Sequence, residues 1–273
     1  MKNIITIFLT LTILAFYGCG PAAKTEETSD ATEETTDIRE KVEREFEYPV
    51  PTSFQVTSLL QTAGAGFVLG ITNPVENVDR YETQRDKALN LGIYGADLSY
   101  SSTYNRQEET MAFLGASKKL VDDLQMGGIF DDQMVSRVES NITNKDSLIL
   151  IITESFYDTY EYLNQNGQSK LSLLVVAGSW IEGLYITTQL AISSGYDDRI
   201  MDIVAKQKAV VKQLNDLLSE NASDEDIASI MPLLNSLTET YSGIEEGSRL
   251  TEEQLSEIFS VVDSTRSEIV GES

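Results

Sequence analysis

Hydrophobic residues recur every three or four positions along most of the chain, which is the spacing of amphipathic α-helices. The first run follows a capping box, in which the Thr52 hydroxyl and the Gln55 side-chain amide each satisfy an otherwise unpaired backbone N–H group. Similar runs predict helices at about 106–125, 132–142, 147–165, 170–194, 198–220, 224–242 and 252–270. No run alternates like a convincing strand. The chain is therefore predicted to be all-α, a multi-helix bundle of eight to ten antiparallel helices.

One further helix is predicted in the segment that begins at Asn73 and Pro74, because proline is favoured at the first helical position. Its small and apolar positions follow the helical spacing: Ala88, Leu91, Gly92, Gly95, Leu98, Ser99 and Ser102. Just before this start signal, FVLGIT at 67–72 could form a short extended piece. The start signal and the spacing together predict a long helix that ends near residue 104.

Two of the predicted helices each carry one acidic residue in an otherwise uncharged run. Asp97 is the only charged residue in 88–105, and Glu182 is the only one in 171–196. Each acid follows a glycine and an aromatic residue and precedes a tyrosine: Gly92, Tyr94 and Tyr100 for the first, Gly178, Trp180 and Tyr185 for the second. This parallel suggests two related halves, 50–144 and 145–270. The sequence leaves open whether they arose by duplication.

Helices that are apolar on both sides are enclosed, so both acids are predicted to be buried. A buried carboxyl group must be hydrogen-bonded, paired or protonated. The main prediction is structural: tyrosine, serine or threonine hydroxyls, or an arginine, satisfy each acid. For Asp97 we expect the hydrogen bonds to come from Tyr100 or Tyr104, or from a residue of another helix. The alternative is a ligand pocket between the central helices, with these candidate residues: Asp97, Tyr100, Tyr104, Trp180, Glu182 and Tyr185.

The N-terminus resembles the export signal of bacterial lipoproteins. A short basic start and an apolar run precede Gly18 and Cys19, which resemble a lipobox, although Phe16 and Tyr17 replace its usual leucine and small residue. A plain secretory signal is the alternative. The resemblance implies that residues 1–18 are a signal peptide and that Cys19 is acylated. Residues 19–37 are predicted to be a disordered acidic tether, and residues 38–273 a single helical domain.

The net charge of the chain limits the classes of partner that it can bind. The formal net charge of −24 opposes contact with phosphate backbones, so nucleic acid is not expected as a partner. The apolar segment 171–192 is long enough to suggest a transmembrane helix. Glu182 at its centre makes insertion costly, however, so we predict a buried central helix instead.

The chain has no histidine, which excludes serine–histidine and cysteine–histidine nucleophile pairs, HExxH zinc sites and Glu-x-x-His di-iron ligands. No glycine-rich phosphate-binding motif is present, and SDEDIAS lacks the ligand spacing of a calcium loop. Two lone helical acids carry no spacing that specifies a reaction. We therefore predict no catalytic residue, no bound metal and no cofactor, and we do not expect an enzyme.

Three stretches, YPVPTSFQVTSLLQTAGAGF, ITNPVENVDRYETQRDKALNLGIYGADLSYSSTYN and GSWIEGLYITTQ, resemble the functionally uncharacterised helical lipoproteins of the Bacteroidetes group. The resemblance covers most of residues 48–190 and supplies no site residue. It agrees with a lipoprotein anchored in the outer membrane of the cell envelope, facing the periplasm or exposed at the surface. The predicted role is non-catalytic, either as a scaffold that binds another envelope protein or, alternatively, as a receptor for a small soluble molecule near Asp97 and Glu182. The oligomeric state is left open.

Overall fold

The computed structural model describes residues 49–126, 130 and 132–271, so the predicted signal peptide, Cys19 and the tether lie outside the described residues. Within these ranges the fold is all-α, as predicted, and contains no strand. The elements are α2 (Ser53–Thr62), the 3-10 helix η1 (Val75–Arg80), α3 (Gln84–Thr103), α4 (Gln107–Asp123), α5 (Asp132–Ser140), α6 (Lys145–Gln165), α7 (Ser169–Ser193), α8 (Asp198–Ser219), α9 (Glu225–Ser242) and α10 (Glu252–Val270). Residues 67–72, the predicted extended piece, lie in the irregular loop between α2 and η1.

Helix starts follow the capping signals closely. The capping box of Thr52 and Gln55 is present, and a second one opens α10 at Thr251. The start predicted at Asn73 and Pro74 is wrong for the long helix, because it opens only the 3-10 helix η1. Tyr81 then takes an extended backbone conformation, and Thr83 caps α3 by accepting a hydrogen bond from the backbone N–H of Asp86. The long helix therefore begins about ten residues later than predicted.

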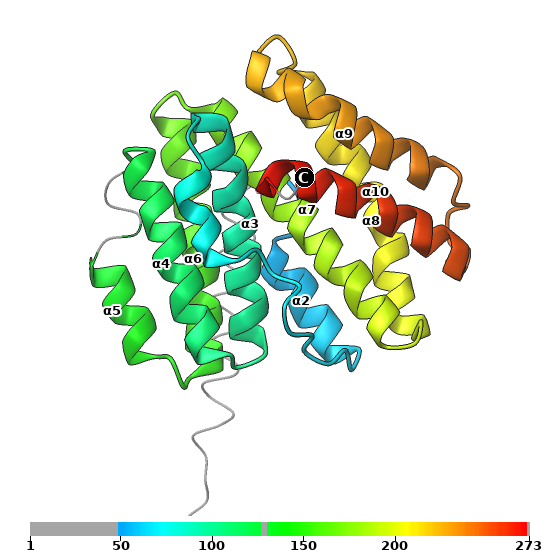
Figure 1. The fold of residues 1–273 in the computed structure, drawn as a ribbon, viewed down its shortest axis with the longest axis horizontal. Coiled ribbons are helices and arrows are strands. Elements are labelled where there is room, and N and C mark those ends of the chain that lie inside the picture. The colour runs from blue at the N-terminus through cyan, green and yellow to red at the C-terminus, as the bar shows by residue number, and fades with distance from the viewer. Residues whose placement is uncertain (1–48, 127–129, 131, 272–273) are drawn as a thin grey trace, which may run out of the picture.

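Helices α3 and α7 form the centre of the bundle (Figure 1). Helix α2 packs against both of them, α4 lies beside α3, and α6 contacts both central helices. On the other side, α8 and α10 cover α7, and α9 packs across α8 and α10. Helix α7 is long and apolar enough to cross a membrane, but its apolar window is entirely buried inside the described bundle. Its high hydrophobicity is explained by this central position.

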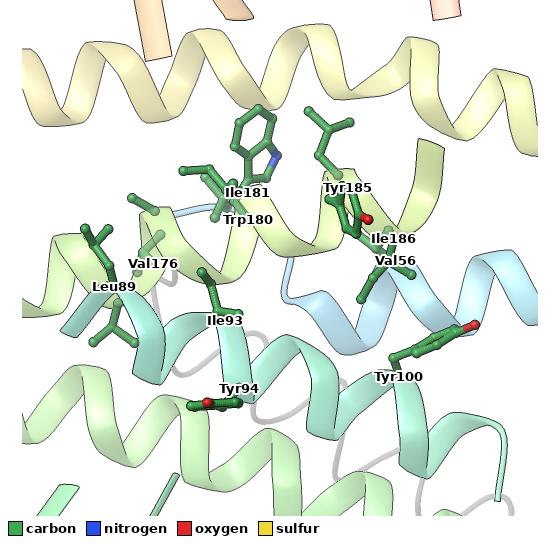
Figure 2. Close-up of a cluster of buried hydrophobic side chains, with 14 of the residues drawn as sticks. Val56, Leu89, Ile93, Tyr94, Tyr100, Val176, Trp180, Ile181, Tyr185 and Ile186 are labelled. Atoms are coloured by element: carbon green, nitrogen blue, oxygen red, sulfur yellow. The ribbon is translucent and has the colours of Figure 1, made fainter. Parts of the chain in front are cut away.

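The two central helices touch backbone to backbone through one glycine on each. A Cβ atom on Gly92 would lie 2.1 Å from the carbonyl oxygen of Val175, and one on Gly178 would lie 2.0 Å from that of Leu89. Figure 2 shows α3 and α7 running in the same direction, so these two helices correct the expectation of a purely antiparallel bundle. The contact is reciprocal, since Leu89 and Gly92 precede Val175 and Gly178 by the same interval. The proposed duplication stays a prediction.

Candidate functional site

The parallel contact of α3 and α7 brings the two lone acids together. Asp97 lies five residues after Gly92, and Glu182 lies four residues after Gly178, so both acids follow the crossing point on the same side. The two carboxyl groups are neighbours, since the charge of Glu182 raises the pKa of Asp97. Both side chains are fully buried, with 0% of their surface exposed. Two acids 85 positions apart in the sequence are thus neighbours in the core, a pairing that the sequence pattern did not predict.

Arg266 of α10 supplies the positive charge of this site. Its Nε donates to Glu182 Oε2 at 2.7 Å, and its side chain is only 4% exposed. The guanidinium carbon lies 4.4 Å from the centre of the Tyr185 ring, in a cation–π contact. Tyr185 in turn stacks on Phe259 of α10, with ring centres 6.2 Å apart. The arginine is therefore held by a carboxylate on one side and by an aromatic face on another.

The irregular loop that follows α2 closes the site. The backbone N–H of Asn73 donates to Asp97 Oδ2 at 3.1 Å. Arg266 Nη2 reaches the carbonyl oxygen of Ile71 at 3.5 Å, the upper limit for a hydrogen bond. Asp97 Oδ1 is buried and has no hydrogen-bond partner in the part of the chain that the structure describes. The loop therefore contributes backbone groups to the site rather than charged side chains.

A second layer of amide groups fixes this loop. The Asn73 side chain donates to the Tyr81 hydroxyl at 2.9 Å and accepts from Asn77 at 2.9 Å. Asn90 on α3 donates to the carbonyl oxygen of Ile269 on α10 at 3.1 Å. Asn73 also contacts Asn90, with 3.4 Å between the donor and acceptor atoms. The network links the loop, α3 and α10, and so holds the Asn73 backbone in position for Asp97.

The proton of the acid pair belongs on Asp97. Burial raises the pKa of Asp97 well above its ordinary value of 3.8, and the nearby charge of Glu182 raises it further. Arg266 and the N–H of Asn73 act in the opposite direction but do not outweigh burial. Burial lowers the pKa of Arg266, yet Glu182 and Asp97 together raise it above its ordinary value. The raised pKa of Asp97 favours its protonated form beside the Glu182 carboxylate, which pairs with Arg266.

Of the six candidate residues, the structure brings Asp97, Glu182 and Tyr185 together and places the other three elsewhere. Tyr100 and Tyr104 do not supply the hydrogen bond of Asp97, which corrects that expectation. The Tyr100 hydroxyl accepts from the backbone N–H of Val68 at 2.7 Å, and the Tyr104 hydroxyl donates to the carbonyl oxygen of Ala65 at 2.8 Å. These phenols hold the loop in place. Figure 2 shows Tyr100 pointing away from the contact between the central helices.

Trp180 takes part in a different contact. Its indole N–H donates to the side-chain oxygen of Gln207 on α8 at 3.1 Å. This satisfies the one polar atom of a side chain that is otherwise packed in the core (Figure 2). Trp180 therefore joins α7 to α8 and takes no part in the acid pair.

No principal cavity of the described chain reaches the acids. A small internal cavity lies between Gly95, Phe156 and Ser117, and a second one lies beside Pro51 and Trp180. The largest, a surface depression of about 340 Å³, lies between the loop after α2 and the α7–α8 turn. Asp97, Glu182 and Arg266 line none of these three. Among the described residues, no cluster of histidine, cysteine or acidic side chains is arranged to hold a metal ion.

Two residues of the site were not predicted individually: Arg266 and Asn73. A signal for Arg266 exists in the sequence, because it falls on the buried stripe of α10 that also contains Ile258, Val262 and Ile269. A charged residue on an apolar stripe predicts a buried partner of opposite charge. Asn73 acts through its backbone, so its side-chain type gave no comparable signal. No protein-family model, curated protein or solved structure matches this chain.

Proposed function

We propose that this chain is a lipid-anchored protein of the bacterial cell envelope that acts as a non-catalytic scaffold. It is held in the outer membrane by an acylated Cys19 and binds another envelope protein through its acidic outer surface. The observation that supports a non-catalytic role is the burial of a set of three neighbouring residues, Asp97, Glu182 and Arg266. Its members are buried, interact with one another and border none of the principal cavities.

The geometry favours this role over catalysis or binding of a small molecule at the acids. One protonated acid, one carboxylate and one guanidinium carry no net charge together, so the set needs no external counterion. Both acids are fully buried, so no solute can reach them in this conformation. The receptor alternative requires a cavity at Asp97 or Glu182, and none of the three cavities reaches them. We therefore place the function on the outer surface.

The outer surface has a pronounced acidic side on α9, α10 and the segment that joins them. The exposed acids there are Glu225, Asp226, Glu239, Glu245, Glu246, Glu252, Glu253, Glu257 and Glu268. Across residues 225–260 the only exposed basic residue is Arg249. Complementary charge raises the association rate and the selectivity of protein contacts. We therefore expect the protein partner to present a basic surface and the complex to weaken as the salt concentration rises.

Capture from native membranes tests the scaffold role. The full-length protein should retain an envelope protein at low salt, and Glu253→Lys/Glu257→Lys should reduce its affinity at least tenfold, or by about 1.4 kcal/mol. Asp132→Lys/Glu139→Lys makes the same charge change on α5, where both acids are exposed, and should bind like the wild type. An equal loss of affinity in both variants would show that the binding is a non-specific electrostatic attraction. Retention of a small metabolite with no protein would support the receptor alternative.

The anchor is tested separately. In cells fed a palmitate analogue, the wild-type protein should be labelled and Cys19→Ala should not, because Cys19 is the only cysteine and the predicted acylation site. Durable membrane attachment is expected because a bacterial lipoprotein carries several acyl chains on this cysteine, whereas one chain alone gives only marginal binding. The measurement is in-gel fluorescence of the immunoprecipitated protein. Equal labelling of the two forms would reject Cys19 as the anchor.

A further inference from the structure

Exposed large hydrophobic side chains gather at one end of the described bundle. They are Leu69 with 75% of its surface exposed, Leu59 with 56% and Ile192 with 37%. All three belong to the segments around the 340 Å³ depression, which is lined by residues of the loop 63–68, the end of α7 and the start of α8. Figure 1 shows the end of α2 and the α7–α8 turn side by side at this end. We call it the apolar end: Leu59, Leu69, Ile192 and the depression between them.

The shape of the apolar end argues against a large protein interface. Leu69 stands at the tip of a loop that turns at Gly70, where φ is +80°. A stable protein contact buries about 1,000 Å² or more of well-packed surface. Three separated aliphatic side chains around a hollow do not supply a complementary core of that size. A fluid lipid surface, by contrast, accepts protruding side chains without a matching shape.

Charge at the apolar end is also suited to a phospholipid surface. Arg199 forms an ion pair with Asp197 at 3.0 Å, and Arg249 forms one with Asp198, so the acids at the start of α8 are neutralised locally. The Arg106 guanidinium lies over the Phe67 ring, 4.9 Å from its centre, at the base of the same loop. Arg106 is itself ion-paired with Glu109, so each of these three arginines is balanced by an acid. The charges at the apolar end therefore balance locally, whereas acids are in excess on the α9–α10 side and would be repelled by anionic lipid.

We propose that the apolar end rests on the phospholipid bilayer, with Leu69, Leu59 and Ile192 inserted among the acyl chains. This inference rests on the proposed lipid anchor, because so small an apolar surface binds only weakly on its own. The predicted acylated Cys19 lies 30 residues before Pro49, the first described residue. Thirty residues span at most about 100 Å even when fully extended, so the anchor keeps the local concentration of bilayer surface high. The bundle then lies against the membrane in one orientation.

Site-specific fluorescence of the full-length lipidated protein tests this contact. If Cys19 is acylated, it carries no free thiol, so an environment-sensitive dye on Leu69→Cys or Ile192→Cys reports one position. The control is Asn166→Cys, an exposed residue of the turn at the opposite end of α7. The vesicles contain phosphatidylethanolamine and phosphatidylglycerol. The expected result is a blue-shifted emission at positions 69 and 192, quenched by brominated acyl chains, with no change at position 166.

The outcomes separate the two proposals. Lipidated protein that fails to float with the vesicles contradicts the anchor itself, and with it the premise of this inference. Protein that floats while the dye at position 69 stays as water-exposed as that at position 166 overturns the membrane contact alone. Shielding of position 69 that needs added envelope proteins, and is absent with lipid only, also overturns it and assigns the apolar end to a protein partner.

Discussion

Replacing Arg266 with methionine should lower the free energy of unfolding by about 3–5 kcal/mol, because it leaves the Glu182 carboxylate without its buried counter-charge. The double variant Arg266→Met/Glu182→Leu should recover part of this loss, since both charges are then absent from the core. The measurement is chemical denaturation of the protein without its lipid, evaluated as a double-mutant cycle.

Arg137→Met is the matched control for this experiment. Arg137 pairs with Glu154 at 2.8 Å, but the two side chains are 49% and 34% exposed. Pairs in such positions contribute about 0–1 kcal/mol, because water screens them and both side chains lose freedom. If Arg266→Met costs no more than Arg137→Met, then the buried set does not stabilise the fold, and the structural role assigned to it is wrong.

Gly178→Ala should also lower the free energy of unfolding, by about 3 kcal/mol or more. The new Cβ would lie 2.0 Å from the carbonyl oxygen of Leu89, and a backbone atom cannot move aside as a flexible side chain can. The two central helices would have to separate, which also disturbs the acid pair that follows the contact. Thermal and denaturant unfolding measure the loss.

Gly183→Ala provides the control on the same helix. The nearest atom to its new Cβ would be the Ser53 hydroxyl oxygen at 3.9 Å, an ordinary contact distance. Since alanine is a better helix former than glycine, this variant should gain roughly 0.4–1 kcal/mol. Equal stability of Gly178→Ala and Gly183→Ala would show that α3 and α7 do not rely on the close glycine contact.

Local signals in the sequence predicted much of the fold. Capping boxes at Thr52 and Thr251 and the apolar spacing of α4 to α10 set most helix boundaries to within a few residues. The burial of Asp97 and Glu182 and the possibility of an arginine partner were also predicted, because two lone acids in enclosed helices need partners. These features depend on interactions within one helix or on composition, which a single sequence records directly.

The remaining features depend on contacts between distant segments. The close packing of α3 against α7 depends on the contact at Gly92 and Gly178, whereas loop lengths predict only that consecutive helices are neighbours. Tyr100 and Tyr104 were expected to serve Asp97, but their hydroxyls lie further along α3 and meet the loop at Ala65 and Val68. The loop then brings the Asn73 backbone to Asp97. Helical spacing shows which way a residue points but not which segment covers it.

In the folded protein, Asp97 keeps a proton that the unfolded chain gives up near pH 4. A raised pKa in the folded state means that the contribution of Asp97 is fully present below the unfolded value of 3.8 and is lost as the pH rises towards the folded value. Asp97→Asn imitates the protonated acid, since its amide can donate to Glu182 and accept from Asn73. Asp97→Ala can do neither and should be about 1–3 kcal/mol less stable than Asp97→Asn.

The most direct test is the free energy of unfolding of wild type and Asp97→Asn, measured by denaturant titration at intervals from about pH 5 to 8. The wild type should lose stability relative to Asp97→Asn as the pH rises, by at most about 1.4 kcal/mol per pH unit, because its folded state keeps a proton on Asp97 that its unfolded state has released. A difference that stays constant across this range would mean that Asp97 is ionised in the fold, and it would contradict the sealed, proton-sharing acid pair.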